Sequence, residues 1–463
     1  MVFSSLIFIF AYFAAVLAVY YVLPRGAKNY WLFAVSLFFY GYGEPLYLFL
    51  MLASIGVNYV MGLLIDRFSD KKQISKFLLI TTVAINLASL GYFKYAAFGV
   101  NIYNSLPFLK DAAIPSIVLP IGISFYTFQI LSYIVDVYLK KCRAQKDFVA
   151  FGTYVCLFPQ LIAGPIVRYT DIEYELKHRK ESMELFEKGS VLFVVGLCKK
   201  VLLANPLGLI WSEIKGVEEG LIINLIGIIA FSLQIYFDFS GYSDMARGLG
   251  NMFGFNFMEN FNYPYISKSV TEFWRRWHIS LGSWFREYVY IPLGGNRCSV
   301  PKNILNLVIT WFLTGLWHGA SWNFVIWGMY FGLLLILEKF VLNKLLKKLP
   351  NWFNHIYALF FIVFGWAIFD FTDMHEMGAF FKNIFSLSGG ILNGNQLSYV
   401  ITVLPTLTVA VAASLPIGKK LYSKLDGYKA KPVIDALLTL AALVLCTASL
   451  VNSSYNPLLY FRF

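Results

Sequence analysis

Charged residues are scarce in this chain. Only 14% of its 463 residues are Asp, Glu, Lys or Arg, whereas 58% are hydrophobic and 18% are aromatic. Soluble domains carry about 25% charged residues, so this composition excludes an ordinary soluble protein. The chain is therefore predicted to be a polytopic membrane protein.

Cysteines and acidic residues are also few. The five cysteines show no paired spacing, which excludes a disulfide framework and a zinc site, and we expect free thiols and no metal. Asp and Glu number 26 against 38 Lys and Arg, a net charge of +12. The basic residues stand in short loops between apolar runs, where they orient helices against anionic lipid. Membrane lipid is thus an expected partner, and nucleic acid is not.

Long apolar runs are what the chain has in abundance, and they predict an all-α polytopic membrane fold. Some runs are short for a full span, so tilted, broken or re-entrant segments are expected among 11 or 12 crossings. The runs are 3–23, 30–42, 46–65, 78–99, 117–139, 151–166, 190–212, 221–246, 303–317, 321–338, 353–371, 397–416 and 433–451.

The positions of Lys and Arg predict the orientation. With the N-terminus outside the cell and 151–166 re-entrant, 33 of the 38 basic residues fall in cytoplasmic loops, while Lys215 falls outside. The re-entrant assignment is chosen to keep this alternation. The first 23 residues lack the basic start of a signal peptide and are predicted to be a retained span. No repeat or linker divides the chain, which predicts a single integral domain over 1–463.

Histidine is rare too, with five in the chain, and one of them stands in an unusual setting. His318 lies in WFLTGLWHGASWNFVIWGMY (311–330), among indoles, small residues and aliphatics. An ionisable residue at membrane depth is by default a functional candidate. A hydrogen-bonding link between helices explains it equally well from this stretch alone.

Residues 273–288, FWRRWHISLGSWFREY, show helical periodicity. Aromatic residues fall within one arc and arginines on the remainder, which predicts an amphipathic helix over about 268–290 at the cytoplasmic interface. Arg275 and Arg276 could hold an anionic lipid or a nucleotide-bearing donor. His278 falls at the edge of the apolar arc, so it either faces a cavity or is incidental to an interfacial anchor.

Polar residues inside the spans indicate an internal polar path or simple helix packing. In 117–139 Gln129 and Asp136 lie on one helical face, and Asp238 lies in the span 221–246. Buried carboxylates need partners or a wet cavity. Gly and Pro also interrupt the spans, in LPIGISF (119–125), FPQLIAGPIVRY (158–169) and IPLGGNR (291–297). Such breaks are tolerated only where protein or water satisfies the backbone, so they are expected to surround a funnel.

The order of these motifs resembles one known family. LPIGISFYTFQILSYIVDVY, FPQLIAGPIVRY, YFDFSGYSDMARG, FNYPYISKSVTEFWRRWHISLGSWFREYVYIPLGG and LTGLWHGASWNFVIWG resemble the membrane-bound O-acyltransferases (MBOAT), in particular the bacterial branch that O-acetylates alginate. The core motifs cover about 117–340. The resemblance implies a ring of helices around a central funnel, with the family's histidines at His318 and His278.

The resemblance also implies the chemistry. Family members take acyl groups from a cytoplasmic thioester, and this branch works with an extracytoplasmic protein that completes transfer to a polymer. We expect acetyl-CoA or an acyl carrier protein as donor substrate, no tightly bound cofactor, and a polysaccharide synthase complex nearby in a bacterial cytoplasmic membrane. His318 is expected to be the general base, or less plausibly to carry the acyl group, with His278 on the donor side.

Two further roles and two alternatives remain at this stage. Trp317 or Trp322 could donate an indole N–H to the oxyanion. The acyl group could instead be D-alanine from a carrier protein. A transporter of acyl compounds that uses His318 as a proton relay is the alternative from another functional class.

Overall fold

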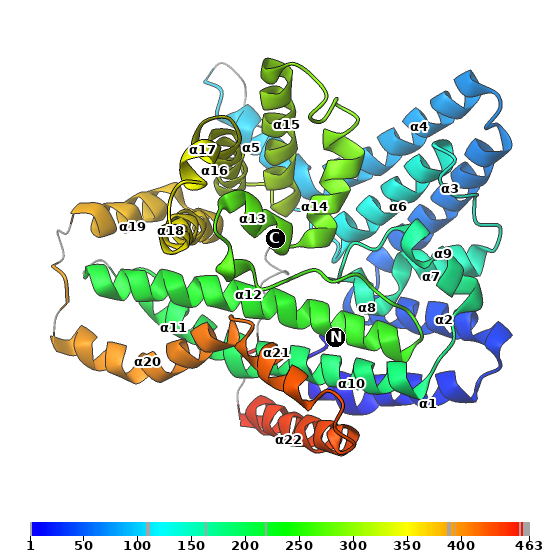
Figure 1. The fold of residues 1–463 in the computed structure, drawn as a ribbon. Coiled ribbons are helices and arrows are strands. Elements are labelled where there is room, and N and C mark those ends of the chain that lie inside the picture. The colour runs from blue at the N-terminus through cyan, green and yellow to red at the C-terminus, as the bar shows by residue number, and fades with distance from the viewer. Residues whose placement is uncertain are drawn as a thin grey trace. The chain divides into compact units, whose positions relative to one another are not determined.

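The computed structural model describes residues 2–107, 112–162, 164–217, 220–386, 390–392, 394–452 and 455–456, and these residues are overwhelmingly helical (Figure 1). They form no β-sheet; one isolated bridge joins Phe261 and Trp277. The all-α polytopic fold is therefore confirmed. The chain divides into two compact units, Met1–Phe193 with Met245–Met258, and Val194–Asp244 with Glu259–Phe463. The single domain over 1–463 stays a prediction.

Helices of the first unit range from 4 residues in α8 to 21 residues in α3. They are α1 (Ala14–Val22), α2 (Arg25–Gly43), α3 (Tyr47–Arg67), α4 (Lys72–Leu90), α5 (Ala96–Asn104), α6 (Ile123–Tyr138), α7 (Phe148–Cys156), α8 (Phe158–Leu161), α9 (Tyr169–His178) and the start of α10 (Met183–Cys198).

The second unit holds the remaining helices. They are α11 (Asn205–Ile214), most of α12 (Leu221–Met252), α13 (Val270–Arg276), α14 (Ile279–Phe285), α15 (Val300–His318), α16 (Trp322–Leu337), α17 (Asn343–Leu346), α18 (Asn351–Asp370), α19 (Met374–Ser386), α20 (Gly394–Ala413), α21 (Ile417–Tyr422) and α22 (Lys431–Asn452). Wider π turns extend several of them, among them η3 (Lys199–Ala204), η5 (Arg286–Tyr290) and η6 (Glu338–Leu342).

Eight helical segments of the described residues are long and apolar enough to cross a membrane. They are Tyr47–Arg67, Lys72–Asn104, Met183–Ile214, Leu221–Met252, Trp322–Leu346, Asn351–Asp370, Gly394–Ala413 and Lys431–Asn452. Each has at least 18 residues, and a bilayer core of about 30 Å needs about 20. The chain is thus a multi-pass membrane protein. The total of 11 or 12 crossings, the ring and the funnel stay predictions.

The predicted breaks in the apolar runs are present. In 151–166 the chain forms α7 and α8, which meet at Leu157. The nine residues of α7 rise only about 13 Å, too little to cross the bilayer core. Before α6, Gly122 adopts a left-handed backbone (φ 73°), and a Cβ there would lie 2.6 Å from the carbonyl oxygen of Leu161. Only glycine allows this close approach of α6 to α8.

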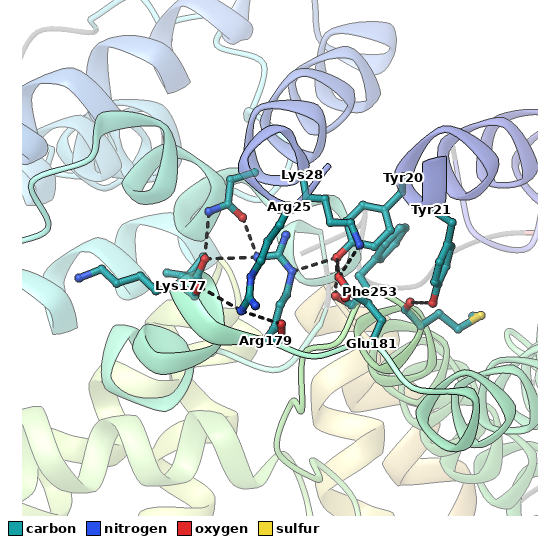
Figure 2. Close-up of polar contacts among 11 residues, drawn as sticks. Tyr20, Tyr21, Arg25, Lys28, Lys177, Arg179, Glu181 and Phe253 are labelled. Atoms are coloured by element: carbon teal, nitrogen blue, oxygen red, sulfur yellow. Dashed lines mark hydrogen bonds and ion pairs between the residues drawn. The ribbon is translucent and has the colours of Figure 1, made fainter. Parts of the chain in front are cut away.

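A polar network ties α1 and α2 to the connection between α9 and α10 (Figure 2). The Arg179 guanidinium donates to the Tyr20 hydroxyl (2.9 Å), and the Arg25 guanidinium donates to the Arg179 carbonyl (3.1 Å). Glu181 accepts from Tyr20 and pairs with Lys28 at 3.0 Å. Burial raises the pKa of the Glu181 carboxyl, but these hydrogen bonds outweigh burial, so its pKa lies below the usual value. The network fixes the start of α10.

Candidate active site

Two histidines from different helices line one cavity of the second unit. The cavity has a volume of about 370 Å³, and His278 and His318 both contribute to its wall. Thr310 and Thr314 of α15 form part of the same wall, and the exposed Arg275 and Arg286 lie at its open side. Both imidazoles thus border one mostly apolar cavity, whose cationic rim consists of Arg275 and Arg286. The sequence placed these histidines 40 residues apart; the fold brings them to the same cavity.

His318 is held by the packing of α15 on α16, which lie side by side (Figure 1). The two helices approach closely at Gly315 and Gly328, where a Cβ on Gly315 would collide with the carbonyl oxygen of Phe324. His318 is the last residue of α15, and Gly319 follows it with an extended backbone. A Cβ on Gly319 would collide with the Phe324 ring. Small residues therefore set the position of this imidazole.

Aromatic rings enclose His318, which is 7% exposed. Its ring lies 5.0 Å from Trp317, 4.9 Å from Trp327 and 5.2 Å from Phe369, in edge-to-face contacts. Trp317 also contacts His278, with ring centroids 5.8 Å apart. One indole therefore touches both imidazoles, so Trp317 couples their positions.

His278 lies at a break in the helix that was predicted over 273–288, and the prediction of one continuous helix is wrong. α13 ends at Arg276, α14 begins at Ile279, and His278 between them has a left-handed backbone (φ 46°). The segment around Phe261 causes the break, because its bridge to Trp277 competes with helical hydrogen bonds. The aromatic residues of this stretch are mostly buried in the second unit.

Burial sets the protonation of His278, which is 2% exposed and lies outside the candidate spans. Removal from water lowers the pKa of this imidazole to about 3, because burial disfavours the charged form. His278 is therefore neutral at cellular pH. Its ring packs edge-on against Phe239 of α12 at 4.7 Å.

The two arginines of α13 have different environments. Arg275 lines the cavity, whereas Arg276 pairs with Glu272 at 3.0 Å and donates to the Asn262 carbonyl. The structure thus brings Arg275 but not Arg276 to the histidines. Glu338 accepts from the backbone N–H groups of Val270 (2.6 Å) and Thr271 (2.8 Å), which fixes the start of α13.

The remaining predicted site residues do not line this cavity. Trp322 is 54% exposed at the start of α16. Asp238 forms a buried ion pair with Lys200 at 2.6 Å. Gln129 and Asp136 belong to the first unit, where the backbone carbonyl of Gln129 accepts from Tyr154 and the Asp136 side chain pairs with Lys141 at 3.1 Å. The ion pairs of Asp136 and Asp238 agree with a packing role for these two carboxylates. Within the described residues, no group of three His, Cys, Asp or Glu side chains could hold a metal ion.

Comparison with known proteins identifies the family. The model of MBOAT, the membrane-bound O-acyltransferase family, matches residues 19–371, which is most of the chain. The chain belongs to this family. The resemblance read from the motifs is confirmed, and the protein is an O-acyltransferase.

Proteins that are similar to this acyltransferase carry names that describe the transfer of acyl groups. It is 37% identical to the "Probable alginate O-acetylase AlgI" of Azotobacter vinelandii over the full length of both chains. It is 31% identical to the peptidoglycan O-acetyltransferase of Helicobacter pylori, over 84% of this chain and 80% of the relative. The teichoic acid D-alanyltransferase of Bacillus subtilis is 29% identical over 55% of this chain and 70% of the relative.

Sequence reasoning missed three features of the acyltransferase's site. Glu338, which is 68 residues away from Val270 in the sequence, accepts a hydrogen bond at the start of α13. Gly282 of α14 lines the cavity. Asn260 accepts from the Ser280 backbone N–H and lies 3.2 Å from His278 Nδ1. Glu338 and Asn260 belong to no periodic pattern that points to the site, whereas Gly282 lies within the periodic segment 273–288. The motif segment FNYPY, directly after Asn260, was the one available signal.

Proposed function

We propose that this acyltransferase transfers an acetyl group from a cytoplasmic thioester, acetyl-CoA or an acyl carrier protein, to an exported polysaccharide. The observation that carries the proposal is the shared cavity of His278 and His318. Relatives named as O-acetylases of alginate and of peptidoglycan support the acetyl group and the polymer class. The proposed site of action is the cytoplasmic membrane of a bacterium, with the N-terminus outside and an extracytoplasmic partner protein that completes the transfer beside the polysaccharide synthase.

His318 is the proposed general base. A thioester is already activated, so the site must orient it, deprotonate the acceptor hydroxyl and stabilise the oxyanion. The imidazole takes the hydroxyl proton while the oxygen attacks the thioester carbonyl. The C–S bond then breaks, and the thiolate leaves with the proton that the imidazolium returns. General base catalysis of this kind contributes about 10²–10⁴-fold in rate.

His278 and the cationic rim serve the donor in this proposal. Arg275 and Arg286 stand at the exposed side of the cavity, and guanidinium groups match the geometry of phosphates. The neutral His278 is placed inside the same space, where it orients the thioester or assists proton movement on the donor side. Trp317 touches both histidines and is the nearer of the two tryptophans proposed to donate to the oxyanion.

The O-acetyl content of the exported polysaccharide tests the site. Cells carrying His318→Ala are expected to lose acetylation, because the proposed general base is removed while His278 stays on the donor side. The matched control is His375→Ala, because His375 is exposed on α19 and does not line the cavity. Unchanged acetylation with normal expression of His318→Ala would reject the assignment.

Filling the cavity gives a second test. Gly282 lines the cavity, and a Cβ added there meets nothing nearer than the Trp274 carbonyl oxygen at 3.8 Å. Gly282→Leu should therefore fold normally and still occupy the donor's space. We expect normal expression with acetylation reduced to a few per cent. Full acetylation would place the donor elsewhere.

Transfer of D-alanine from a carrier protein is the second candidate, favoured by the similarity to the D-alanyltransferase. Incubating purified protein with labelled acetyl-CoA or with a D-alanyl carrier protein separates the two, since only the true donor loses its thioester. Movement of an intact acyl compound between compartments, without thioester cleavage, would instead support a transporter.

A further inference from the structure

The side chain of Asn260 is the meeting point of three polar groups around His278. Its Oδ1 accepts from the Ser280 backbone N–H at 3.0 Å and from the Ser280 hydroxyl at 3.0 Å, and it lies 3.2 Å from His278 Nδ1. Asn260 is 1% exposed, so water does not compete for these bonds. All three residues belong to the second unit.

The backbone N–H of Ser280 identifies which side-chain atom of Asn260 it contacts. An amide N–H can only donate, so the Asn260 atom that it meets is the carbonyl oxygen and not the NH₂ group. A carbonyl oxygen can only accept. His278 Nδ1 must therefore carry the proton in this contact, and in a neutral imidazole the lone pair is then on Nε2.

Asn260 also holds the backbone at His278. Its carbonyl accepts from the Ile279 N–H at 3.0 Å, and the next residue but one, Asn262, donates to the Arg276 carbonyl at 2.9 Å. These two bonds flank the left-handed residue and stabilise a conformation that is unfavourable for a residue with a side chain. The segment from Asn260 to Asn262 thus fixes both the left-handed backbone at His278 and the position of its imidazole.

We propose that Asn260 is the positioning residue of the donor-side histidine: its side-chain oxygen keeps His278 in the Nδ1-protonated tautomer and makes Nε2 the basic nitrogen. This inference rests on the proposed function, because it assigns His278 Nε2 to the proton transfer. Asn260 itself does not contact the donor; it acts through the imidazole.

Other charged or titratable groups stand on the elements packed around His278. Arg275, Arg286, Tyr290 and His318 line the same cavity. Asp238 precedes the Phe239 that packs on the imidazole, and it is paired with Lys200; Glu259 precedes Asn260 and is exposed. The Ser280 hydroxyl also lies 3.5 Å from His278 Nδ1, but Asn260 Oδ1 is nearer, at 3.2 Å, and it accepts the hydroxyl's own proton.

Three variants of the purified full-length protein test the inference. Asn260→Asp keeps an acceptor for all three groups but adds a charge that favours imidazolium. Asn260→Leu removes the acceptor at similar volume. Asn262→Leu is the matched control, because it makes the same substitution two residues away, where the side chain is exposed and the contacts to Arg276 come from the backbone. For each, kcat and KM are measured for transfer from labelled acetyl-CoA between pH 5 and 9.

Asn260→Leu is expected to lower kcat about 100-fold with the donor KM unchanged, because the wrong tautomer leaves His278 Nε2 without the lone pair that assists proton transfer on the donor side, while binding is kept. Asn260→Asp should keep kcat within about threefold, while the acid limb of its pH profile moves to higher pH. Asn262→Leu should match the unaltered protein. Unaltered kcat in Asn260→Leu, or an unshifted pH profile in Asn260→Asp, would overturn the inference; if Asn260→Leu does not fold, the pH profile decides.

A measurement without turnover separates this inference from the proposed function. In protein with ¹⁵N-labelled histidine, the His278 resonances, assigned by their loss in His278→Gln, should show a protonated Nδ1 and an unprotonated Nε2 at pH 7. The opposite tautomer would refute the role of Asn260 even if acetyl transfer is confirmed. The expected tautomer in a protein that cleaves no acetyl-CoA would leave the Asn260 contact standing and refute the function.

Discussion

The two imidazoles of the cavity are held by different forces. His278 is fixed by a hydrogen bond at Nδ1 and by a constrained backbone. His318 is fixed by rings on three sides and by the end of its helix. The surroundings of the two imidazoles therefore differ, although both line the same cavity.

Burial of His278 predicts a pH dependence of stability. The pKa of its imidazole is about 3 in the folded protein, against about 6.5 when the chain is unfolded. Between these values the unfolded state binds a proton that the folded state does not, so stability is complete above about pH 6.5 and falls as the pH decreases. The slope for one such group is about 1.4 kcal/mol per pH unit.

Thermal unfolding of the purified protein between pH 5 and 8 measures this effect. His278→Gln, which cannot titrate, should lose less stability between pH 6.5 and pH 5 than the unaltered protein does. Parallel curves for the two proteins would show that His278 is not neutral and buried.

The sequence indicates the candidate histidines of the site but not the residues that position them. His318 and His278 stand in recognisable motifs, and Trp317 adjoins His318, whereas Phe369 contacts the same ring from a distant part of the chain. Asn260 comes from an irregular segment whose hydrogen bonds form only after folding, so no periodicity reveals it. Asp238 was read as part of a polar path because its partner, Lys200, is 38 residues away in the sequence.

At the scale of the helices, the contact between α15 and α16 sets the depth of His318. The helices approach at Gly315 and Gly328, where the Gly315 Cβ position lies 3.2 Å from the Gly328 Cα atom. In lipid, small residues stabilise helix pairs by allowing such backbone contact.

The amphipathic pattern of 273–288 shows why a helix cannot be predicted from its own periodicity alone. Its periodicity is real, but bridging to the segment at Phe261 divides it in two.

Adding a methyl group at Gly315, where α15 contacts α16, should displace His318. Gly315→Ala is expected to destabilise the protein by about 1–3 kcal/mol, the usual cost of overpacking, and to abolish acetyl transfer. The control is Gly378→Ala in α19, where a Cβ meets nothing within 4 Å and helix propensity should be gained. Thermal unfolding and the transfer assay check both. Equal stability of the two variants would contradict the close contact.

Helix α22 packs beside the end of α10, and a pair of thiols reports on this contact. Cys198 Sγ and Cys446 Sγ lie 3.5 Å apart as free cysteines. Mild oxidation of the purified protein should form an intramolecular disulfide between them, seen by mass spectrometry as a linked peptide pair. Cys446→Ser removes the product. If oxidation links neither cysteine to the other, α22 does not occupy this position.

At the scale of the whole molecule, the sequence identifies the class of protein and predicts the threading, but it does not determine the number of crossings. Apolar runs identify membrane helices because lipid demands them. Length alone does not separate a span from a broken segment such as α7 with α8. One ion pair agrees with the threading: Lys215 and Asp370, 2.6 Å apart, both fall on the predicted extracytoplasmic side.

A reporter fused after Lys215 tests this orientation in cells. The distribution of Lys and Arg predicts that a periplasmic reporter is active there, whereas one fused after Lys344, in a predicted cytoplasmic loop, is inactive. A cytoplasmic signal at Lys215 would overturn the re-entrant assignment of 151–166, since that assignment fixes the side of every later loop.

The most direct measurement is cleavage of labelled acetyl-CoA by the purified protein with an acceptor hydroxyl present. The cavity shared by His318 and His278 predicts that the unaltered protein releases free coenzyme A and acetylates the acceptor, that His318→Ala is slower by about 10²–10⁴-fold, and that His375→Ala is unaffected. Equal rates for the unaltered protein and His318→Ala would contradict the account.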